Sequence, residues 1–232
     1  MKVAVMNFSG NVGKSTISRH LLLPRIKNAE IISVETINSD ESSDQSIKGK
    51  QFGKLQEALI LKDAVIVDVG ASNSEDFIRL MKQYKGSYKE FDYFIIPTAP
   101  KNKQIRDTIS TIDALSEIGV EKEKIRTVFN MIEDDDIINQ SFSGLIHYYN
   151  ETNKFTLIPE ATIHSNDIYA TIKDNKIDLL IQDETDYKQK IKETTNPDEK
   201  VYYAQMIALK RLAIGVNEEL DNVFENLFES NK

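Results

Sequence analysis

The sequence predicts an α/β protein with an open, mostly parallel sheet, helices on both faces, and a helical C-terminal extension. Short apolar runs alternate with segments of helical periodicity up to Asn166, and strands that alternate in this way pair in parallel through crossover helices. The run Ala64–Val69 is apolar on both faces, as expected for a strand inside a parallel sheet. From Asn166 onward only helical patterns occur, with a charged interruption at Gln182–Lys200.

Six runs of apolar and β-branched residues are predicted to be strands. In chain order they are Lys2–Asn7, Glu30–Ile37, Ala64–Val69, Tyr93–Ile96, Ile125–Met131 and Phe155–Ile158. The fourth run is closed by Pro97 and the last by Pro159, so we expect these two strands to end there.

Helical segments are predicted between the strands. The first ends near Leu23, because Pro24 pushes the residue before it out of the α region. The others carry apolar residues at helical spacing, and they are Gln51–Leu61, Ile105–Ile118 and roughly Ile137–Tyr149. Residues 38–51 contain four serines and almost no large apolar side chain, which predicts a loop.

The composition excludes several classes of protein. The 232 residues suit one large α/β domain, and 40% hydrophobic with 28% charged residues excludes a disordered or fibrous chain. Without cysteine, disulfides, thiolate metal sites and cysteine nucleophiles are excluded. The net charge of 29 − 37 = −8 does not favour nucleic acid. No apolar run approaches the roughly 18 residues of a membrane span, so we expect a cytoplasmic protein.

The segment between the first strand and the first helix predicts a phosphate-binding loop. It reads Gly10-Asn11-Val12-Gly13-Lys14-Ser15-Thr16. Glycines let successive backbone N–H groups turn toward an anion, and the N-terminus of the following helix adds partial positive charge. Lys14 supplies an ammonium for the β and γ phosphates, Ser15 a hydroxyl for Mg²⁺, and Thr16 a contact to the α phosphate.

The common pattern G-x-x-x-x-G-K-[ST] is not fully met, because Phe8 occupies the position of its first glycine. An ordinary strand-to-helix turn that happens to contain Gly-Lys-Ser is the alternative. The strand before the loop and the helix after it are the context that a nucleotide-binding loop requires. That context favours nucleotide binding.

Asp68 closes the buried run Ala64–Val69. Ligands of open α/β sheets bind beyond the carboxyl ends of the strands, so this carboxylate is predicted to hold Mg²⁺ or its water as a Walker B aspartate does. A turn former or helix N-cap is the alternative. The segment Gly70-Ala71-Ser72 would then be the switch that senses the γ phosphate.

Ser9–Thr16 resembles the deviant Walker A loop K-G-G-x-G-K-[ST]-T of the ParA/MinD family of dimeric ATPases. With Arg19–Leu22 and Val34–Asn38, the opening looks closer still to the StbB branch of plasmid-stability ATPase-like proteins. The resemblance covers about the first two-thirds of the chain and is also strong across Asp68–Asn73. Beyond Asn166 no specific resemblance is present. It implies a single P-loop ATPase-like domain over residues 1–232, with 166–232 as its helical extension.

The resemblance also implies ATP or ADP and Mg²⁺ as ligands. It implies Lys14, Asp68 and Glu35 as catalytic residues, and Ser15 and Asp68 as metal ligands. The nucleotide contacts that it implies are Gly10, Asn11, Val12, Gly13, Lys14, Ser15, Thr16, Asn130 and Pro159. Asn130 would read the adenine ring and Pro159 belongs to the loop around the base. An ordinary turn residue is the alternative for Asn130, and a solvated strand-end carboxylate for Glu35.

Two positions depart from the family pattern. Ser9 occupies the position of the lysine that reaches the partner's phosphates, and Ile37 that of the carboxylate that orients the attacking water. Candidate replacements are Lys101, Lys103 and Arg106 for the lysine, and Glu35, Asn38 and Asp40 for the carboxylate. Because losing one such cation costs several powers of ten in rate, we expect slow or absent hydrolysis.

The partners implied by the resemblance are a second copy, in a nucleotide-dependent homodimer, and a plasmid-encoded DNA-binding or adaptor protein. The segment Val216–Lys232 has an apolar stripe formed by Leu220, Val223, Phe224, Leu227 and Phe228. Its net charge of 1 − 5 = −4 is repelled by anionic lipid, so we expect packing on the domain or a second subunit and not on a membrane. Nonspecific DNA binding stays open, because basic and acidic residues are interspersed.

Together these observations predict an ATP- and Mg²⁺-dependent switch ATPase that acts in plasmid stability, partition or positioning. One alternative is a small P-loop kinase or ligase acting on a metabolite, although the sequence shows no lid arginines. A non-hydrolysing nucleotide-binding module is another alternative, favoured by Ser9 and Ile37.

Overall fold

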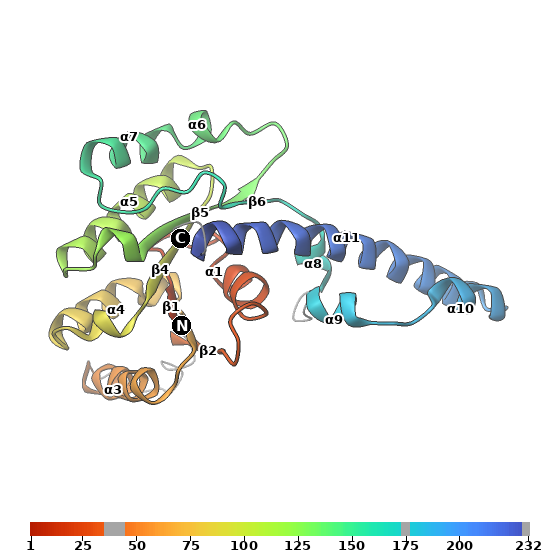
Figure 1. Ribbon diagram of the computed structural model, residues 1–232, viewed down its shortest axis with the longest axis horizontal. Helices are drawn as coiled ribbons and strands as arrows, with labels where there is room; N and C mark the ends of the chain where they lie inside the picture. Colours follow the sequence, from red (N-terminus) through yellow and green to blue (C-terminus); the bar gives the residue numbers. More distant parts are fainter. Residues whose placement is uncertain (35–44, 173–176, 229–232) are drawn as a thin grey trace. The chain divides into compact units, whose positions relative to one another are not determined.

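The computed structural model describes residues 1–34, 45–172 and 177–228 (Figure 1). The chain divides into two compact units, of which the first comprises Met1–Ser165 with Val223–Lys232 and the second comprises Asn166–Asn222. The first unit contains the sheet, and the described part of the second is helical. Glu35, Ile37, Asn38 and Asp40, for which the sequence suggested roles, lie outside the described residues.

The first unit is built on a six-stranded sheet with the strand order β2-β3-β1-β4-β5-β6. Its strands are β1 Lys2–Val5, β2 Glu30–Ser33, β3 Val65–Asp68, β4 Tyr93–Thr98, β5 Ile125–Ile132 and β6 Thr162–His164. Every neighbouring pair is parallel. From β1 the chain forms β2 and β3 on one side, and it then crosses to form β4, β5 and β6 on the other side. The carboxyl end of β1 is therefore the switch point where ligands bind in such sheets.

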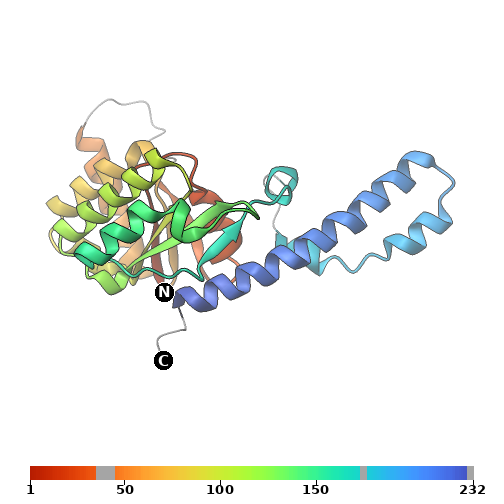
Figure 2. The same ribbon diagram turned by 90° about the horizontal axis from the view of Figure 1, so that it is seen from above.

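Helices cover both faces of the sheet, as the sequence predicts (Figures 1 and 2). Those of the first unit are α1 Lys14–Thr16, α3 Gln45–Leu61, α4 Ala71–Gln83, α5 Asn102–Glu117, α6 Ile138–Ser141, α7 Ser143–Thr152 and the last turn of α11 Pro197–Phe228. A π-helix, Ile17–Leu22, continues α1, and short 3-10 turns occur at Ser87–Glu90 and Lys122–Lys124. α1 lies on one face, and α3, α4, α5 and α7 lie on the other.

The strands are apolar on both faces because each face is covered by helices. Ala4 of β1 belongs to the large core that also contains Phe77 of α4 and Leu115 of α5. Its neighbours Val3 and Val5 point to the opposite face and are also fully buried. This double burial holds the carboxyl ends of the central strands at one edge of the sheet, where the loop after β1 lies.

Two strand predictions near prolines are wrong, and β2 ends at Ser33, before the predicted end at Ile37. β4 continues through Pro97 to Thr98, because β1 pairs with β4 only as far as Ile95, and beyond it β4 pairs with β5 alone. The run Phe155–Ile158 is not a strand: it forms a single bridge through Thr156, and the last strand is β6. The ring of Phe155 packs against Tyr148 and Tyr149 of α7, and this packing explains why an apolar residue occupies the position.

Three helical predictions also need correction. Helix α4 was not predicted, although Phe77, Leu80 and Met81 are spaced as on one face of a helix and are buried. Helix α3 begins at Gln45, within the predicted loop 38–51, and residues 35–44 lie outside the described ranges. The helix predicted over Ile137–Tyr149 is interrupted at Phe142, whose backbone leaves the helical region between α6 and α7.

The second unit contains α8 Ile168–Ile172, α9 Ile177–Gln182, α10 Tyr187–Glu193 and most of α11. α10 and α11 lie side by side (Figures 1 and 2), and the rings of Tyr187 and Tyr203 are 5.9 Å apart. Asp186 caps α10 by accepting a hydrogen bond from the backbone N–H of Gln189. Among the described residues, no helix is both long and apolar enough to cross a membrane.

Candidate phosphate-binding site

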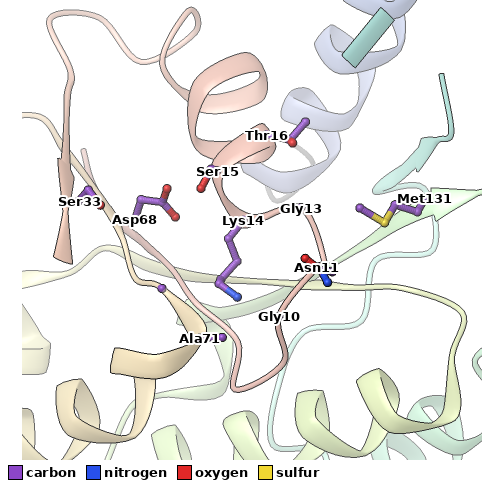
Figure 3. Close-up of a pocket in the computed structure, with 11 residues that line it drawn as sticks. Gly10, Asn11, Gly13, Lys14, Ser15, Thr16, Ser33, Asp68, Ala71 and Met131 are labelled. Carbon is purple, nitrogen blue, oxygen red and sulfur yellow. The ribbon is translucent and has the colours of Figure 1, made fainter. Parts of the chain in front are cut away.

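A cavity of about 440 Å³ lies beyond the carboxyl ends of the central strands (Figure 3). Its lining residues are Gly10, Asn11, Gly13, Lys14, Ser15, Thr16, Ser33, Asp68, Gly70, Ala71 and Met131. They come from the loop after β1, from the ends of β2 and β3, from the start of α4 and from β5. The structure therefore brings most of the predicted loop together with the predicted aspartate.

The loop turns sharply because two of its residues have a left-handed backbone. Asn11 has φ 54° and Gly13 has φ 85°. Gly13 precedes α1, and its carbonyl accepts a hydrogen bond from the N–H of Ile17 at 2.9 Å. A Cβ atom at Gly13 would lie 2.1 Å from Nδ2 of Asn130. Glycine is therefore required here both by the left-handed backbone and by the lack of room for a side chain.

Lys14 is only 8% exposed, and its ammonium lies inside the loop. Nζ donates to the carbonyl of Ser9 at 2.6 Å and to that of Asn7 at 3.3 Å. The side chain thus holds a positive charge at the centre of the cavity wall (Figure 3), where it compensates loop carbonyls. A phosphate group would offer the same ammonium a charged acceptor, which makes a stronger hydrogen bond.

Ser15 and Asp68 present oxygen atoms to the same part of the cavity (Figure 3). Asp68 is the last residue of β3 and is placed by its two neighbouring strands, opposite Val5 of β1 and Ser33 of β2. A hydroxyl and a carboxylate are the oxygen ligands that Mg²⁺ accepts beside phosphate oxygens. Ser33 also lines the cavity, and no sequence motif marks it.

Asn7 anchors the loop, a role that the sequence motifs did not predict. This side chain is fully buried, and Nδ2 donates to the carbonyl of Pro97 and to Oγ1 of Thr108, both at 2.8 Å. Its Oδ1 accepts from the N–H of Ser9 at 2.7 Å, and its carbonyl accepts from Oγ of Ser74 at 3.2 Å. The sequence signal for Asn7 is a polar residue that directly follows the apolar residues of a buried strand. A polar side chain buried at such a position needs hydrogen-bond partners.

One face of α5 supplies further contacts to the loop. Gln104, Thr108 and Thr111 are spaced one helical turn apart and are buried. Nε2 of Gln104 donates to the carbonyl of Asn11 at 3.2 Å, and Oγ1 of Thr111 accepts from the N–H of Phe8 at 3.0 Å. The loop is therefore held by side chains about a hundred positions later in the chain.

Asn130 and Met131 lie at a bulge of β5 beside the loop. Asn130 is 4% exposed, donates from Nδ2 to the carbonyl of Val12 at 2.9 Å, and does not line the cavity. Met131 has φ 60° at the bulge, is 40% exposed, and places its apolar side chain at the cavity. Bulges redirect side chains next to functional sites in this way.

Some predicted residues are not brought to the cavity. Pro159 is exposed and lies in the turn before β6, and the side chain of Val12 is fully buried in the core. Ser9 is 2% exposed. The exposed basic residues at the start of α5, which were candidate replacements for the family's lysine, are Lys101, Lys103 and Arg106, and none of them lines the cavity.

The start of α4 forms the opposite wall. Gly70 and Ala71 line the cavity, so the segment predicted to be a switch is the N-terminus of a helix. Oγ of Ser74 donates to the carbonyl of Gly70 at 3.0 Å and to that of Asn7 at 3.2 Å, which ties this helix to the loop after β1. Two helix N-termini therefore contribute positive potential to one cavity.

The residues present fit a nucleoside triphosphate with Mg²⁺. The loop offers backbone N–H groups and the Lys14 ammonium to phosphates, and Ser15 and Asp68 offer oxygen ligands to a hard cation. The volume of about 440 Å³ is within the usual range of small-molecule sites. The exposed thioether of Met131 adds an apolar surface at the same cavity.

The fold is shared with several solved structures. The chain is similar to the MinD cell division protein of Aquifex aeolicus, with 14% identity, 92% of this chain and 96% of that chain covered, and a TM-score of 0.50. It is similar to apo McdA of Cyanothece, with 14% identity, coverage of 97% and 98%, and a TM-score of 0.52. A putative plasmid partition protein of Borrelia burgdorferi B31, bound to AMPPNP, shares 12% identity over 98% of both chains, with a TM-score of 0.52.

These likenesses define the class of fold. The chain has the parallel α/β fold that is seen in MinD, in McdA and in a putative plasmid partition protein. The predicted fold class is thereby confirmed. No protein-family model matches the sequence, and no curated protein matches it.

Proposed function

We propose that the chain is a nucleotide-dependent switch that binds ATP with Mg²⁺ in the cavity after β1. The observation that carries this proposal is the convergence of Lys14, Ser15 and Asp68 on one cavity. These residues come from the loop and from a strand end more than fifty positions later in the sequence. The partition protein whose structure was solved with AMPPNP has the same fold, which supports this choice of ligand.

The residues of the chain divide the work of binding between them. The backbone N–H groups of Gly10–Thr16 hold the phosphates, and Lys14 moves from the carbonyl of Ser9 to a phosphate oxygen. Ser15 and Asp68 hold Mg²⁺, which neutralises phosphate charge when it is bound. Asn130, through its bond to Val12, keeps the loop in shape in this proposal, and its role toward adenine, with that of Pro159, stays a prediction. Glu35 stays a proposed catalytic carboxylate outside the described residues.

Hydrolysis is proposed to be slow. Ser9 carries no ammonium in place of the family's lysine, and among the described residues Lys14 is the only cation that lines the cavity of one copy. A module that binds nucleotide without turnover is the second candidate, and the buried Ser9 favours it. Single-turnover assays with ATP and Mg²⁺ separate the two, and a rate above about 1 s⁻¹ would contradict both.

The biological role that we propose is plasmid stability, partition or positioning, as in the StbB branch. The support is the opening sequence, which resembles that branch, together with the shared fold of MinD and a partition protein. In this role the protein acts in the cytoplasm as a nucleotide-dependent homodimer. It signals its nucleotide state to a DNA-binding or adaptor protein.

Calorimetric titration with ATP, in the presence and absence of Mg²⁺, tests the proposal. Lys14→Ala is expected to weaken ATP binding at least tenfold, because it removes the only side-chain cation among the described residues that line the cavity. Asp68→Asn is expected to abolish the gain in affinity from Mg²⁺ while leaving metal-free binding in place. Lys103→Ala is the matched control, since Lys103 is exposed and lies outside the cavity. Equal affinity for wild type and Lys14→Ala would refute the proposal.

A further inference from the structure

An apolar face of α11 is left exposed within the second unit. Val201, Ala204, Ala208, Leu212 and Gly215 recur every three or four positions and therefore lie along one side of the helix. All five are exposed, with Val201 at 57% and Leu212 at 45%. We call these five residues the α11 stripe. Aliphatic side chains aligned in this way gain free energy when another apolar surface covers them.

The neighbouring helix of the same unit uses a different side of α11. Tyr203 meets the ring of Tyr187 from α10, and Lys210 donates a hydrogen bond to the carbonyl of Asp183. Tyr203 and Lys210 are seven positions apart and point in a direction well away from the stripe. Contacts with α10 therefore leave the stripe open.

We propose that the α11 stripe binds the α11 stripe of a second copy of this chain, antiparallel and with the two-fold axis at Ala208. In that arrangement residues equally distant from Ala208 meet across the interface. Val201 then faces Gly215 of the other copy, Ala204 faces Leu212, and Ala208 faces itself. Each larger side chain meets a smaller residue, so both helices can approach closely along the whole stripe.

Charges beside the stripe favour the same orientation. Lys200 and Glu218 are both exposed and are 18 positions apart, which is about five helical turns, so they lie on the same edge of α11. Antiparallel pairing about Ala208 brings Lys200 of each copy near Glu218 of the other. In a parallel dimer the two-fold axis runs along the helices, so these edges of the two copies lie on opposite sides and Lys200 meets no Glu218. Opposite charges at the two ends of one edge therefore select the antiparallel dimer.

Charge also argues for a protein partner and against a lipid surface. α11 contains six acidic and three basic side chains, and an acidic helix is repelled by anionic lipid. A second copy supplies both the apolar stripe and the complementary charges. Because the stripe includes no residue of the phosphate-binding cavity, this dimer is distinct from the nucleotide-dependent dimer proposed above and needs no ATP.

Sedimentation equilibrium of the full chain without nucleotide tests this interface. Wild type is expected to dimerise, and Leu212→Glu is expected to weaken the dimer at least tenfold. Ile214→Glu is the matched control, since Ile214 is also an exposed aliphatic residue of α11 but lies off the stripe. Lys200→Glu and Glu218→Lys should each weaken the dimer, and the double variant should restore it. A wild-type chain that stays monomeric at about 100 µM, or that is monomeric and sediments with anionic vesicles, would overturn the proposal.

Cross-linking tests the orientation, and it is simple because the chain has no cysteine. Ala208→Cys is expected to form a disulfide-linked dimer on mild oxidation, because position 208 meets itself at the axis. Val201→Cys should not, since the two copies of position 201 would be about 21 Å apart along the helices. Cross-linking at 201 as efficient as at 208, or none at 208, would overturn the arrangement. Calorimetric ATP affinity of the same variants is expected to be unchanged, so failure here is distinguishable from failure of the proposed function.

Discussion

Gly13 is subject to two constraints that act on the same residue. Its backbone is left-handed, and Nδ2 of Asn130 occupies the space where a side chain would begin. The same amide group donates to the carbonyl of Val12, so the close approach is also what holds the loop. At the scale of single residues, the site depends on the absence of a side chain at Gly13 as much as on the ammonium of Lys14.

Gly13→Ala is expected to destabilise the protein by about 1–3 kcal/mol from backbone strain alone, with a further cost from displacing Asn130. Urea unfolding measures this loss. Asn130→Ala in the same chain should recover the part due to the clash and leave the part due to φ. Gly10→Ala is the control, because a Cβ there meets no atom within 4 Å and the φ angle of Gly10 is not positive. Similar losses for the two single variants would contradict this explanation.

At the scale of elements, α5 acts as the support of the loop. Thr108 accepts a hydrogen bond from Asn7 at 2.8 Å and donates to Thr98 at 3.1 Å, so one hydroxyl joins the loop after β1 to β4 and α5. Gln104 and Thr111 extend this contact to both ends of the loop. The amphipathic helix α5 thus carries buried polar side chains where the loop after β1 needs hydrogen-bond partners.

Thr108→Val is expected to cost about 1–3 kcal/mol, because it keeps the volume but removes partners of Asn7 and Thr98 in a buried site. It should also weaken ATP binding by relaxing the loop. Chemical denaturation and calorimetric titration measure the two effects. Ser110→Val on the exposed side of α5 serves as the control and should change neither. Unchanged ATP affinity in a destabilised Thr108→Val would show that the helix supports stability alone.

The turn before α10 is an element whose stability depends on acid pH. Hydrogen bonds from Thr185 and Tyr187 hold the pKa of Asp183 at about 2, below its ordinary 3.8, and Asp183 raises the pKa of Tyr187 to about 12. A lowered pKa means that the ionised carboxylate stabilises the folded turn. This contribution is complete above about pH 4 and is lost as the pH falls toward 2.

Tyrosine fluorescence or near-ultraviolet circular dichroism between pH 5 and 2 is expected to show a change around Tyr187 with a midpoint near 2. Asp183→Asn should remove that transition and leave the spectrum at pH 5 partly changed already. A midpoint close to 4 in the wild-type chain would mean that these hydrogen bonds do not hold the carboxylate.

At the scale of the whole molecule, ligand binding and folding are linked through the first unit. The cavity draws on residues from the loop after β1 to β5, so the proposed nucleotide would find its site only in the folded chain. At a concentration one hundred times the dissociation constant, such a ligand stabilises the folded state by about 2.7 kcal/mol.

Thermal unfolding followed by circular dichroism is therefore expected to shift upward with ATP and Mg²⁺. The shift should shrink to the metal-free value in Asp68→Asn and nearly vanish in Lys14→Ala. Leu212→Glu, which alters the α11 stripe only, should keep the full shift. An ATP-dependent shift of the same size in Lys14→Ala would place the nucleotide elsewhere in the molecule.

The sequence by itself determined the fold class, the order of most elements and the position of the loop. Each of these follows from local patterns: apolar runs for buried strands, helical spacing, and glycines between a strand and a helix. The errors at Pro97 and Phe155 have one cause. The local pattern indicates that Phe155 is buried and that Pro97 cannot donate a backbone hydrogen bond. It does not indicate which element lies beside either residue.

Only the tertiary structure decided which distant side chains hold that loop. Asn7 meets Thr108, 101 positions later, and Asn130 meets the carbonyl of Val12, 118 positions earlier. The bulge that turns Met131 toward the cavity likewise depends on the pairing of β5 with β6. Such contacts arise from how the parallel strands align at one edge of the sheet, and that alignment is a property of the packed sheet and not of any one segment.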